Sequence, residues 1–187
     1  MKQAIKFQLS VDDIDLADLK KRIRNTRWAD EVPGNKGEYG TKKSYLRDLV
    51  EYWSDTFDWR QQEQLLNSFK QFKTKVMGID LHFIHEKGSG SNPMPLLLSH
   101  GWPGSVFEFH KLIPMLTNPE KYGANPTDSF TVVAPSLPGY CFSFVPDQQR
   151  FSCEMIADCF VELMRDQLGF LKFGAQGGDW GSFVTSR

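Results

Sequence analysis

The sequence predicts an α/β protein in which a parallel, doubly wound sheet follows an all-helical N-terminal arm. Beyond the first ~70 residues, short apolar runs alternate with segments of helical spacing, a pattern typical of strands joined by crossover helices. Before them, apolar residues recur at helical spacing in three segments. Two glycine-rich turns directly follow two of the apolar runs, where open α/β sheets place their functional sites.

Length and composition fit a globular protein of ordinary domain size. The chain has 187 residues, of which 40% are hydrophobic and 24% are charged, and this balance allows a sizeable core. The 22 Lys and Arg residues against 23 Asp and Glu residues give a net charge of −1. This near-balance provides no electrostatic surface for nucleic acid or an anionic membrane, so we expect neither as a partner.

Targeting signals and cysteine pairs are not evident in the sequence. Residues Met1–Phe7 lack the apolar core of a signal peptide, and no run approaches the ~20 apolar residues that cross a bilayer. The cysteines are odd in number and lack metal-binding spacing. They are Cys141, Cys153 and Cys159. We therefore expect a cytoplasmic protein with reduced thiols and no transmembrane anchor.

The arm is expected to open with a short strand or extended segment and a helix. Apolar residues alternate weakly over Ile5–Leu9, as in a strand. Ser10 is expected to cap the helix that follows, with Asp13 at the capping-box position. Basic residues crowd positions 20–24, where they would complement the negative end of the helix dipole.

Two further helices are expected to complete the arm. Thr41 begins the second helix, which carries apolar side chains at helical spacing as far as Trp53. Asp58 caps a third, shorter helix that runs through Leu66, with Gln61 in its capping-box position.

The core begins where helical spacing gives way to alternation. Phe72–Val76 and Ile79–His85 are expected to form a hairpin around the Met77-Gly78 turn. Three later apolar runs, separated by helices, are expected to be parallel neighbours in one sheet. These strands are Pro95–Ser99, Phe130–Ala134 and Leu171–Ala175, and the helices lie near Val106–Leu116 and Glu154–Leu168.

Asp179 is the strongest candidate for a catalytic residue. It lies in the run Gly177-Gly178-Asp179-Trp180-Gly181, directly after the apolar stretch Phe170–Ala175. Glycines two before and two after a nucleophile let a strand and a helix approach around a strained turn. A carboxylate in that position implies an alkyl-enzyme ester instead of an acyl-enzyme. An isolated aspartate would be interpreted as a solvated loop carboxylate. The preceding apolar stretch, the flanking glycines and the second glycine-rich turn together favour a nucleophile.

The second glycine-rich turn is His100-Gly101-Trp102-Pro103-Gly104, directly after an expected strand. In hydrolases with such an elbow, the oxyanion hole takes one backbone N–H from this earlier loop and one from the residue after the nucleophile. Trp102 and Trp180 are therefore the expected donors. Pro103 restricts Trp102 to extended or bridging backbone geometry, which helps to aim its N–H inward. We expect His100 to order its own turn and not to act as a base.

These turns, together with runs in the arm, resemble the N-terminal half of an epoxide hydrolase of the microsomal and juvenile-hormone type. The matching runs span nearly the whole chain and together are specific, whereas haloalkane dehalogenases share the elbow alone. The runs are Arg22, Thr26–Trp28, Tyr52–Trp53, Phe57–Arg60, Leu66–Asn67, Phe69, Phe72, Gly78–Ile79, Leu81–His85, His100–Ser105, Pro135–Tyr140 and Gln176–Gly181. The resemblance implies an N-terminal arm over residues 1–72, followed over residues 73–187 by an α/β-hydrolase core that stops after the nucleophile elbow.

The resemblance also implies a reaction, the conversion of a small apolar epoxide and water to a vicinal diol. In the family, an aspartate attacks an epoxide carbon and lid tyrosines donate to the opening oxygen. A histidine oriented by a second carboxylate then activates the water that hydrolyses the ester. Asp179 matches the nucleophile, and Trp102 and Trp180 match the oxyanion donors. No cofactor or metal is implied, and His82 and His85 point to opposite faces of an expected strand, so they cannot share a metal.

The rest of that machinery has no match in this sequence. All four histidines precede the elbow, the tyrosines stop at Tyr140, and eight residues follow Asp179. Cys141 stands where the family usually has glycine after Pro-Gly-Tyr, which places a side chain in that turn. We therefore expect the isolated chain to show little or no turnover.

Three explanations for the missing catalytic residues stay open. The chain is a fragment of a longer enzyme, or a second polypeptide supplies the lid and the histidine, or the chain is a non-catalytic binding or interaction module. In the isolated chain the strand before the elbow would present an unpaired edge. A haloalkane dehalogenase-like hydrolase is a further alternative. The arm argues against it, because dehalogenases generally lack a region of the Asp58-Trp59-Arg60 type.

Overall fold

The computed structural model describes residues 4–187, which form two compact units. One unit combines the chain up to Gln8 with Leu65–Arg187, and the other comprises Leu9–Gln64. We call them the sheet unit and the arm unit. The division of the chain after residue 72, expected from the sequence, stays a prediction.

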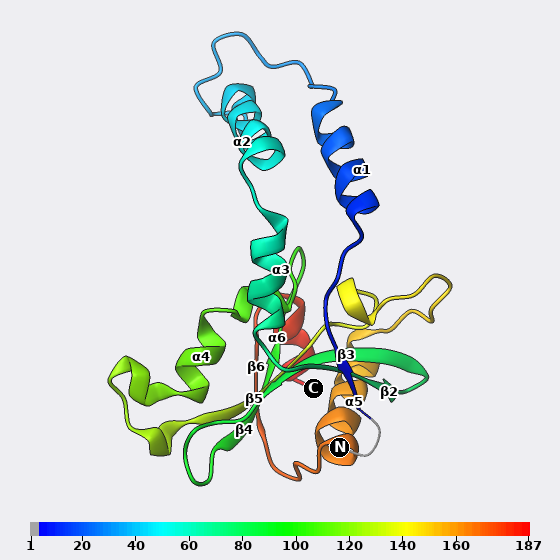
Figure 1. The fold of residues 1–187 in the computed structure, drawn as a ribbon. Coiled ribbons are helices and arrows are strands. Elements are labelled where there is room, and N and C mark those ends of the chain that lie inside the picture. Colours follow the sequence, from blue (N-terminus) through cyan, green and yellow to red (C-terminus); the bar gives the residue numbers. More distant parts are fainter. Residues whose placement is uncertain (1–3) are drawn as a thin grey trace. The chain divides into compact units, whose positions relative to one another are not determined.

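The sheet unit is built on a mixed sheet (Figure 1). Its strand order over the described residues is β1-β2-β3-β5-β4-β6. β4 lies between β5 and β6 and is parallel to both, whereas the pairs β1–β2, β2–β3 and β3–β5 are antiparallel. The strands are β1 (Ile5–Phe7), β2 (Gln71–Val76), β3 (Ile79–Glu86), β4 (Met94–Ser99), β5 (Phe130–Pro135) and β6 (Gly174–Gly177).

Two predictions about the sheet are confirmed. The three runs expected to be parallel neighbours are β4, β5 and β6. The expected hairpin joins β2 to β3 through Met77 and Gly78, whose φ angles are 45° and 81°. Two consecutive residues with positive φ make the tight turn that matches the twist of antiparallel strands.

The last strand begins later than the sequence predicts, at Gly174 instead of Leu171. Gly169, with φ of 79°, marks the end of the preceding helical segment, and Leu171 is 75% exposed in the loop after it. Phe170 and Phe173 pack against the core from that loop. The apolar run therefore reflects two anchoring aromatic side chains and not a buried strand.

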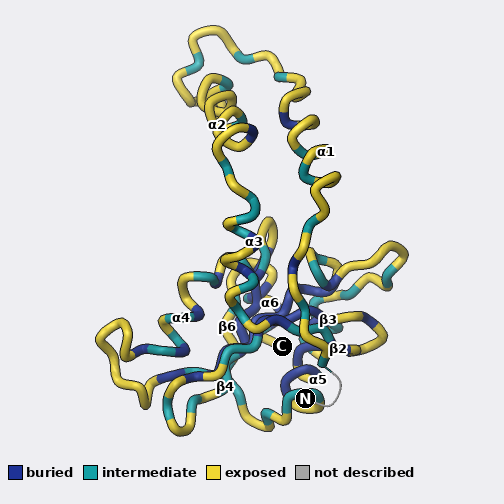
Figure 2. Tube along the Cα trace, in the orientation of Figure 1, coloured by how far each residue is buried: buried dark blue, intermediate teal, exposed yellow. Residues whose placement is uncertain are grey.

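Both faces of the sheet are covered, because neighbouring residues of each strand point to opposite sides. Leu97 and Val133 pack with buried residues of α5 (Cys153–Glu162) and α6 (Trp180–Thr185). Leu98 and Val132 pack with buried residues around Val106–Phe109 and α4 (Leu112–Thr117) on the other face. Figure 2 shows the buried strands between these layers. Burying one such side chain contributes roughly 1.5–3 kcal/mol.

Two expected helices of the sheet unit are interrupted. The segment expected over Val106–Leu116 is a 3₁₀ turn at Val106–Phe109 followed by α4. Pro114 lies in the first turn of α4, where a missing N–H costs no helical hydrogen bond. α5 begins after Ser152, which caps it by accepting from the Met155 N–H at 3.3 Å. It continues as a π-helical turn over Leu163–Gln167.

The arm unit carries α1 (Asp13–Arg24), α2 (Lys43–Asp55) and the first part of α3 (Trp59–Asn67). Ser10 does not cap α1, contrary to the sequence prediction, and the N-cap is Asp12. The backbone N–H of Val11 instead donates to Glu63 Oε2 at 2.8 Å, which keeps this segment out of the helix.

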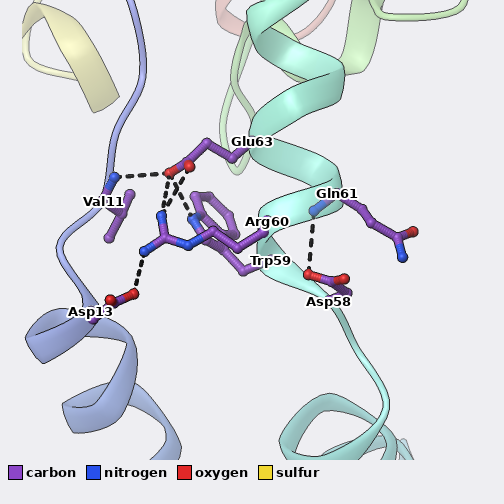
Figure 3. A network of polar contacts seen from close by, with 7 residues as sticks. All are labelled: Val11, Asp13, Asp58, Trp59, Arg60, Gln61 and Glu63. Atoms are coloured by element: carbon purple, nitrogen blue, oxygen red, sulfur yellow. Dashed lines mark hydrogen bonds and ion pairs between the residues drawn. The ribbon is translucent and has the colours of Figure 1, made fainter.

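The start of α2 also differs, because the helix begins at Lys43 and not at Thr41. Glu31 supplies the capping acceptor from a distant loop, since its Oε1 accepts from the Lys43 N–H at 3.1 Å. The predicted cap of α3 is confirmed: Asp58 Oδ1 accepts from the Gln61 N–H at 3.3 Å (Figure 3).

A polar network in the arm unit is centred on Glu63 (Figure 3). Besides the Val11 N–H, its carboxylate accepts from Trp59 Nε1 at 3.3 Å and from Arg60 at 2.9 and 3.0 Å. Arg60 also pairs with Asp13. These bonds lower the Glu63 pKa, with the Val11 N–H as the largest cause. Glu63 thus ties the chain before α1 to α3.

Candidate functional site

Asp179 occupies the turn between β6 and α6, outside the helix, as predicted. Its backbone angles, φ 52° and ψ −125°, lie in a region that non-glycine residues rarely adopt. Its carbonyl oxygen accepts from the Ser182 N–H at 3.0 Å and from the Ser182 hydroxyl at 2.6 Å. Strain of this kind costs on the order of 1–3 kcal/mol and persists only where surrounding structure holds it.

Three glycines are required because a side chain at any of them would have no room at this turn. A Cβ at Gly101 would lie 2.5 Å from both Cβ and Oδ1 of Asp179. A Cβ at Gly177 would overlap the Gly181 carbonyl, and one at Gly181 would overlap the Ser99 carbonyl oxygen. The two glycine-rich turns of the sequence thus meet at Asp179.

One of the two expected N–H donors, that of Trp102, contacts the carboxylate. The Trp102 N–H donates to Asp179 Oδ1 at 2.7 Å. The pKa of Asp179 is held below its usual value, first by the Trp102 N–H and then by the adjacent Trp180 N–H, although desolvation acts in the opposite direction. Trp102, the residue before the cis bond to Pro103, is 66% exposed, and Trp180 is 46% exposed. The carboxylate is therefore ionised at neutral pH and has accessible indole rings on the residues that bind it.

His100 orders the first of these turns, as expected, but it also contacts a second loop. Its ring is buried; Nε2 accepts from the Leu137 N–H and Nδ1 lies against the Gly101 carbonyl oxygen, both at 3.0 Å. Since an amide only donates and a carbonyl only accepts, Nδ1 carries the proton and the ring is neutral. Burial is the largest cause that lowers the His100 pKa.

Sequence reasoning missed the contribution of the loop after β5. Tyr140 packs edge-on against His100 with ring centroids 5.5 Å apart. Its pKa is raised, first by burial and then by the charge of Asp179. The sequence could have indicated this contribution, because β4 and β5 were expected to be parallel neighbours, and the carboxyl ends of parallel strands lie at one edge of the sheet.

Two other histidines, His82 and His110, contact partners away from Asp179. His82 is buried between Ser136 Oγ, 2.9 Å from Nδ1, and Gln71 Oε1, 3.0 Å from Nε2. His110 Nδ1 lies 2.8 Å from the Phe107 carbonyl oxygen. Within residues 4–187, no histidine hydrogen bonds to Asp179, and no group of three His, Cys, Asp or Glu side chains could hold a metal ion.

Cys141 lies in the left-handed region, with φ of 41°. A side chain there costs about 1 kcal/mol more than glycine does. We expect Cys141→Gly to have a higher free energy of unfolding than Cys141→Ala by about 1 kcal/mol, because both lack the thiol and only alanine keeps a Cβ. Urea denaturation measures the difference. Equal stabilities, or a more stable alanine variant, would show that this turn is not strained.

The fold and the elbow define an α/β hydrolase. The family model for the alpha/beta hydrolase fold matches residues 94–187, and the model for the epoxide hydrolase N terminus matches residues 4–109. The chain belongs to the epoxide hydrolase family. The match of the arm also favours this family over the haloalkane dehalogenases.

Individual relatives agree with this assignment. The chain is 42% identical to epoxide hydrolase 1 of Oryctolagus cuniculus, over 96% of its own length and 40% of the relative. It is 37% identical to juvenile hormone epoxide hydrolase 2 of Ctenocephalides felis, over 96% and 38%. The chain thus spans about two fifths of the length of these curated relatives.

Solved structures share the fold. Juvenile hormone epoxide hydrolase of Bombyx mori superposes with a TM-score of 0.86 at 33% identity, covering 98% of this chain and 48% of that one. The epoxide hydrolase of Aspergillus niger gives 0.84 at 34% identity with the same coverage. No helix within residues 4–187 is long and apolar enough to cross a membrane. The expected cytoplasmic location stays a prediction.

Proposed function

We propose that this chain carries the ester-forming half of an epoxide hydrolase, with Asp179 as the nucleophile. The 2.7 Å bond from the Trp102 N–H to Asp179 Oδ1, at a strained strand-to-helix turn, supports this role most strongly. Because a backbone N–H holds Oδ1, the second oxygen, Oδ2, is left to attack. The lowered pKa keeps the nucleophile ionised at neutral pH.

The proposed reaction begins when Oδ2 attacks one carbon of a small apolar epoxide. A new C–O bond forms, the epoxide C–O bond to that carbon breaks, and the resulting alkoxide takes a proton from a donor or from water. The product is an ester in which Oδ1 is the carbonyl oxygen. Because Oδ1 already accepts from the Trp102 N–H, this donor of the oxyanion hole is in place before the ester forms. Each such donor typically contributes ~3 kcal/mol to the transition state of the following hydrolysis step.

Hydrolysis of that ester requires a base that activates water, and none of the four histidines hydrogen bonds at Asp179 in the described chain. We propose that sequence corresponding to the unmatched three fifths of the relatives supplies this base, a second acid and the donors to the epoxide oxygen. It would belong either to a longer chain or to a second polypeptide. This chain alone would then form the ester slowly and retain it.

A non-catalytic interaction role is the second candidate. β6 pairs with β4 along one edge, and no strand within the described residues pairs with its other edge. Such an edge can accept a strand from another protein. The N–H groups on Asp179 have no purpose in that role, so we place it second.

Intact-mass spectrometry after incubation with styrene oxide tests the proposed function. We expect a slow, single addition of one epoxide molecule to the wild type and none to Asp179→Asn, because an amide oxygen is a poor nucleophile. Asp147→Asn is the matched control, since Asp147 is also an exposed aspartate with positive φ, 62°. Equal modification of all three proteins, or rapid repeated turnover to diol by the wild type, would contradict the proposal.

A further inference from the structure

His100 lies between the two loops that form the candidate site. On one side its Nδ1–H donates to the Gly101 carbonyl, directly before Trp102, whose N–H holds Asp179. On the other side its Nε2 accepts from the Leu137 N–H of the loop after β5. The ring is 1% exposed, so water cannot replace either partner.

The loop after β5 is itself fixed to the core. The Ser136 N–H donates to the His82 carbonyl at 2.9 Å, and the His82 N–H donates to Ser143 Oγ at 3.0 Å. β3 therefore holds both ends of the loop, and the loop presents the Leu137 N–H to His100. Tyr140 of the same loop packs edge-on against the imidazole. The loop thus contacts the ring through both a hydrogen bond and an aromatic side chain.

We propose that His100 is a positioning residue for Asp179: its neutral imidazole ties the turn that carries Trp102 to the loop after β5 and so fixes the Trp102 N–H on the carboxylate. This inference rests on the proposed role of Asp179 as nucleophile. His100 takes no part in proton transfer with the substrate. It acts through Gly101 and Trp102.

The proposed role depends on the protonation state of the ring. A proton on Nε2 would set an N–H against the Leu137 N–H, so the bond between the two loops would be lost. The ionisable groups that face His100 are Glu108, Tyr140 and, across Gly101, Asp179. The Glu108 charge favours the proton, but burial of the ring opposes it more strongly.

Acid is therefore expected to slow ester formation as His100 gains a proton. A histidine in water titrates near pH 6.5 and an aspartate near 3.9. The pKa of each group is lowered here, that of His100 by burial and that of Asp179 by the Trp102 N–H. Protonation of His100 would break the bond between the two loops, whereas protonation of Asp179 would remove the nucleophile itself. A variant that does not titrate at position 100 separates the two causes.

The test is the rate of adduct formation with styrene oxide from pH 4 to pH 8, followed by intact mass. Three variants accompany the wild type. His100→Gln places an oxygen within reach of the Leu137 N–H and does not titrate. His100→Asn is shorter and keeps only a donor for the Gly101 carbonyl. His110→Asn is the control, because His110 bonds to the Phe107 carbonyl away from the site.

For the wild type and His110→Asn, we expect the rate of adduct formation to fall on acidification along the titration curve of a single proton. At pH 7.5, His100→Asn should react roughly 10- to 100-fold more slowly than the wild type, as misplaced catalytic groups do. His100→Gln should react faster than His100→Asn and show no acid loss. Near-UV circular dichroism at each pH confirms that the compared proteins are folded.

The outcomes separate this inference from the proposed function. If the wild type forms no adduct at any pH, the role of Asp179 is wrong. If it forms an adduct on Asp179 but His100→Gln and His100→Asn react equally at pH 7.5, His100 is not a positioning residue. An acid loss that persists in His100→Gln would assign the titration to another group and overturn the inference as well.

Discussion

Gly181→Ala is expected to destabilise the protein by at least about 3 kcal/mol, or to prevent folding. The added methyl group would overlap the Ser99 carbonyl oxygen and lie 2.9 Å from the His100 carbonyl oxygen. Both obstacles are backbone atoms at the carboxyl end of β4, so no side chain can rotate away. β4 or α6 would have to move, and β4 is paired on both sides in the sheet.

Gly178→Ala is the matched control in the same motif, because a Cβ there meets nothing within 4 Å. We expect its free energy of unfolding to stay within about 0.5 kcal/mol of the wild type, as for most surface changes. Urea denaturation followed by tryptophan fluorescence compares the two. Similar loss in both variants, or no loss in Gly181→Ala, would show that α6 does not contact β4 as described.

Acidification is expected to remove up to about 5 kcal/mol of stability through His82 alone. Burial, aided by the charge of Lys73, lowers the pKa of His82 to about 3. In the unfolded chain the ring takes up a proton near pH 6.5, whereas the folded protein excludes it until about pH 3. Between these values the unfolded state binds more protons, so the contribution is complete above pH 6.5 and is lost as the pH falls.

The free energy of unfolding at several pH values between 4 and 7 measures this effect. His82→Gln keeps polar atoms near Ser136 and Gln71 but does not titrate. Its stability at pH 7 is expected to be lower than that of the wild type, and its dependence on pH should be shallower. Parallel pH profiles for the two proteins would mean that His82 takes up its proton in the folded state near its ordinary pKa.

Local patterns in the sequence predicted most of the sheet unit. Alternation of apolar residues predicted β2 and β3, short apolar runs predicted β4 and β5, and the Met77-Gly78 turn predicted the hairpin. Prediction failed where a residue distant in sequence determines the local structure. Val11 lies outside α1 with its N–H bound by Glu63, and the N–H of Lys43 at the start of α2 is bound by Glu31. Neither acceptor could be assigned from spacing along the chain.

The candidate site shows the same limit. The pattern around Asp179 predicted the elbow and the Trp102 N–H that contacts the carboxylate, since small residues and a strand-to-helix turn are local features. The contact of Gly101 with Asp179 and the bond from Leu137 to His100 join three separate loops. They follow from strand order, because β4 lies between β5 and β6. The sequence predicted these three strands as neighbours but not their order.

The position of the adduct tests the central proposal, that Asp179 is the nucleophile, most directly. Trypsin cleavage after Lys172 releases Phe173–Arg187, in which Asp179 is the single side-chain carboxylate and which contains no cysteine or histidine. After incubation with styrene oxide, we expect this peptide to carry the mass of one epoxide molecule, with fragment ions that assign it to Asp179. Hydroxylamine should remove the group and leave a hydroxamate, as an ester requires. An adduct on another peptide, or one that resists hydroxylamine, would contradict the account.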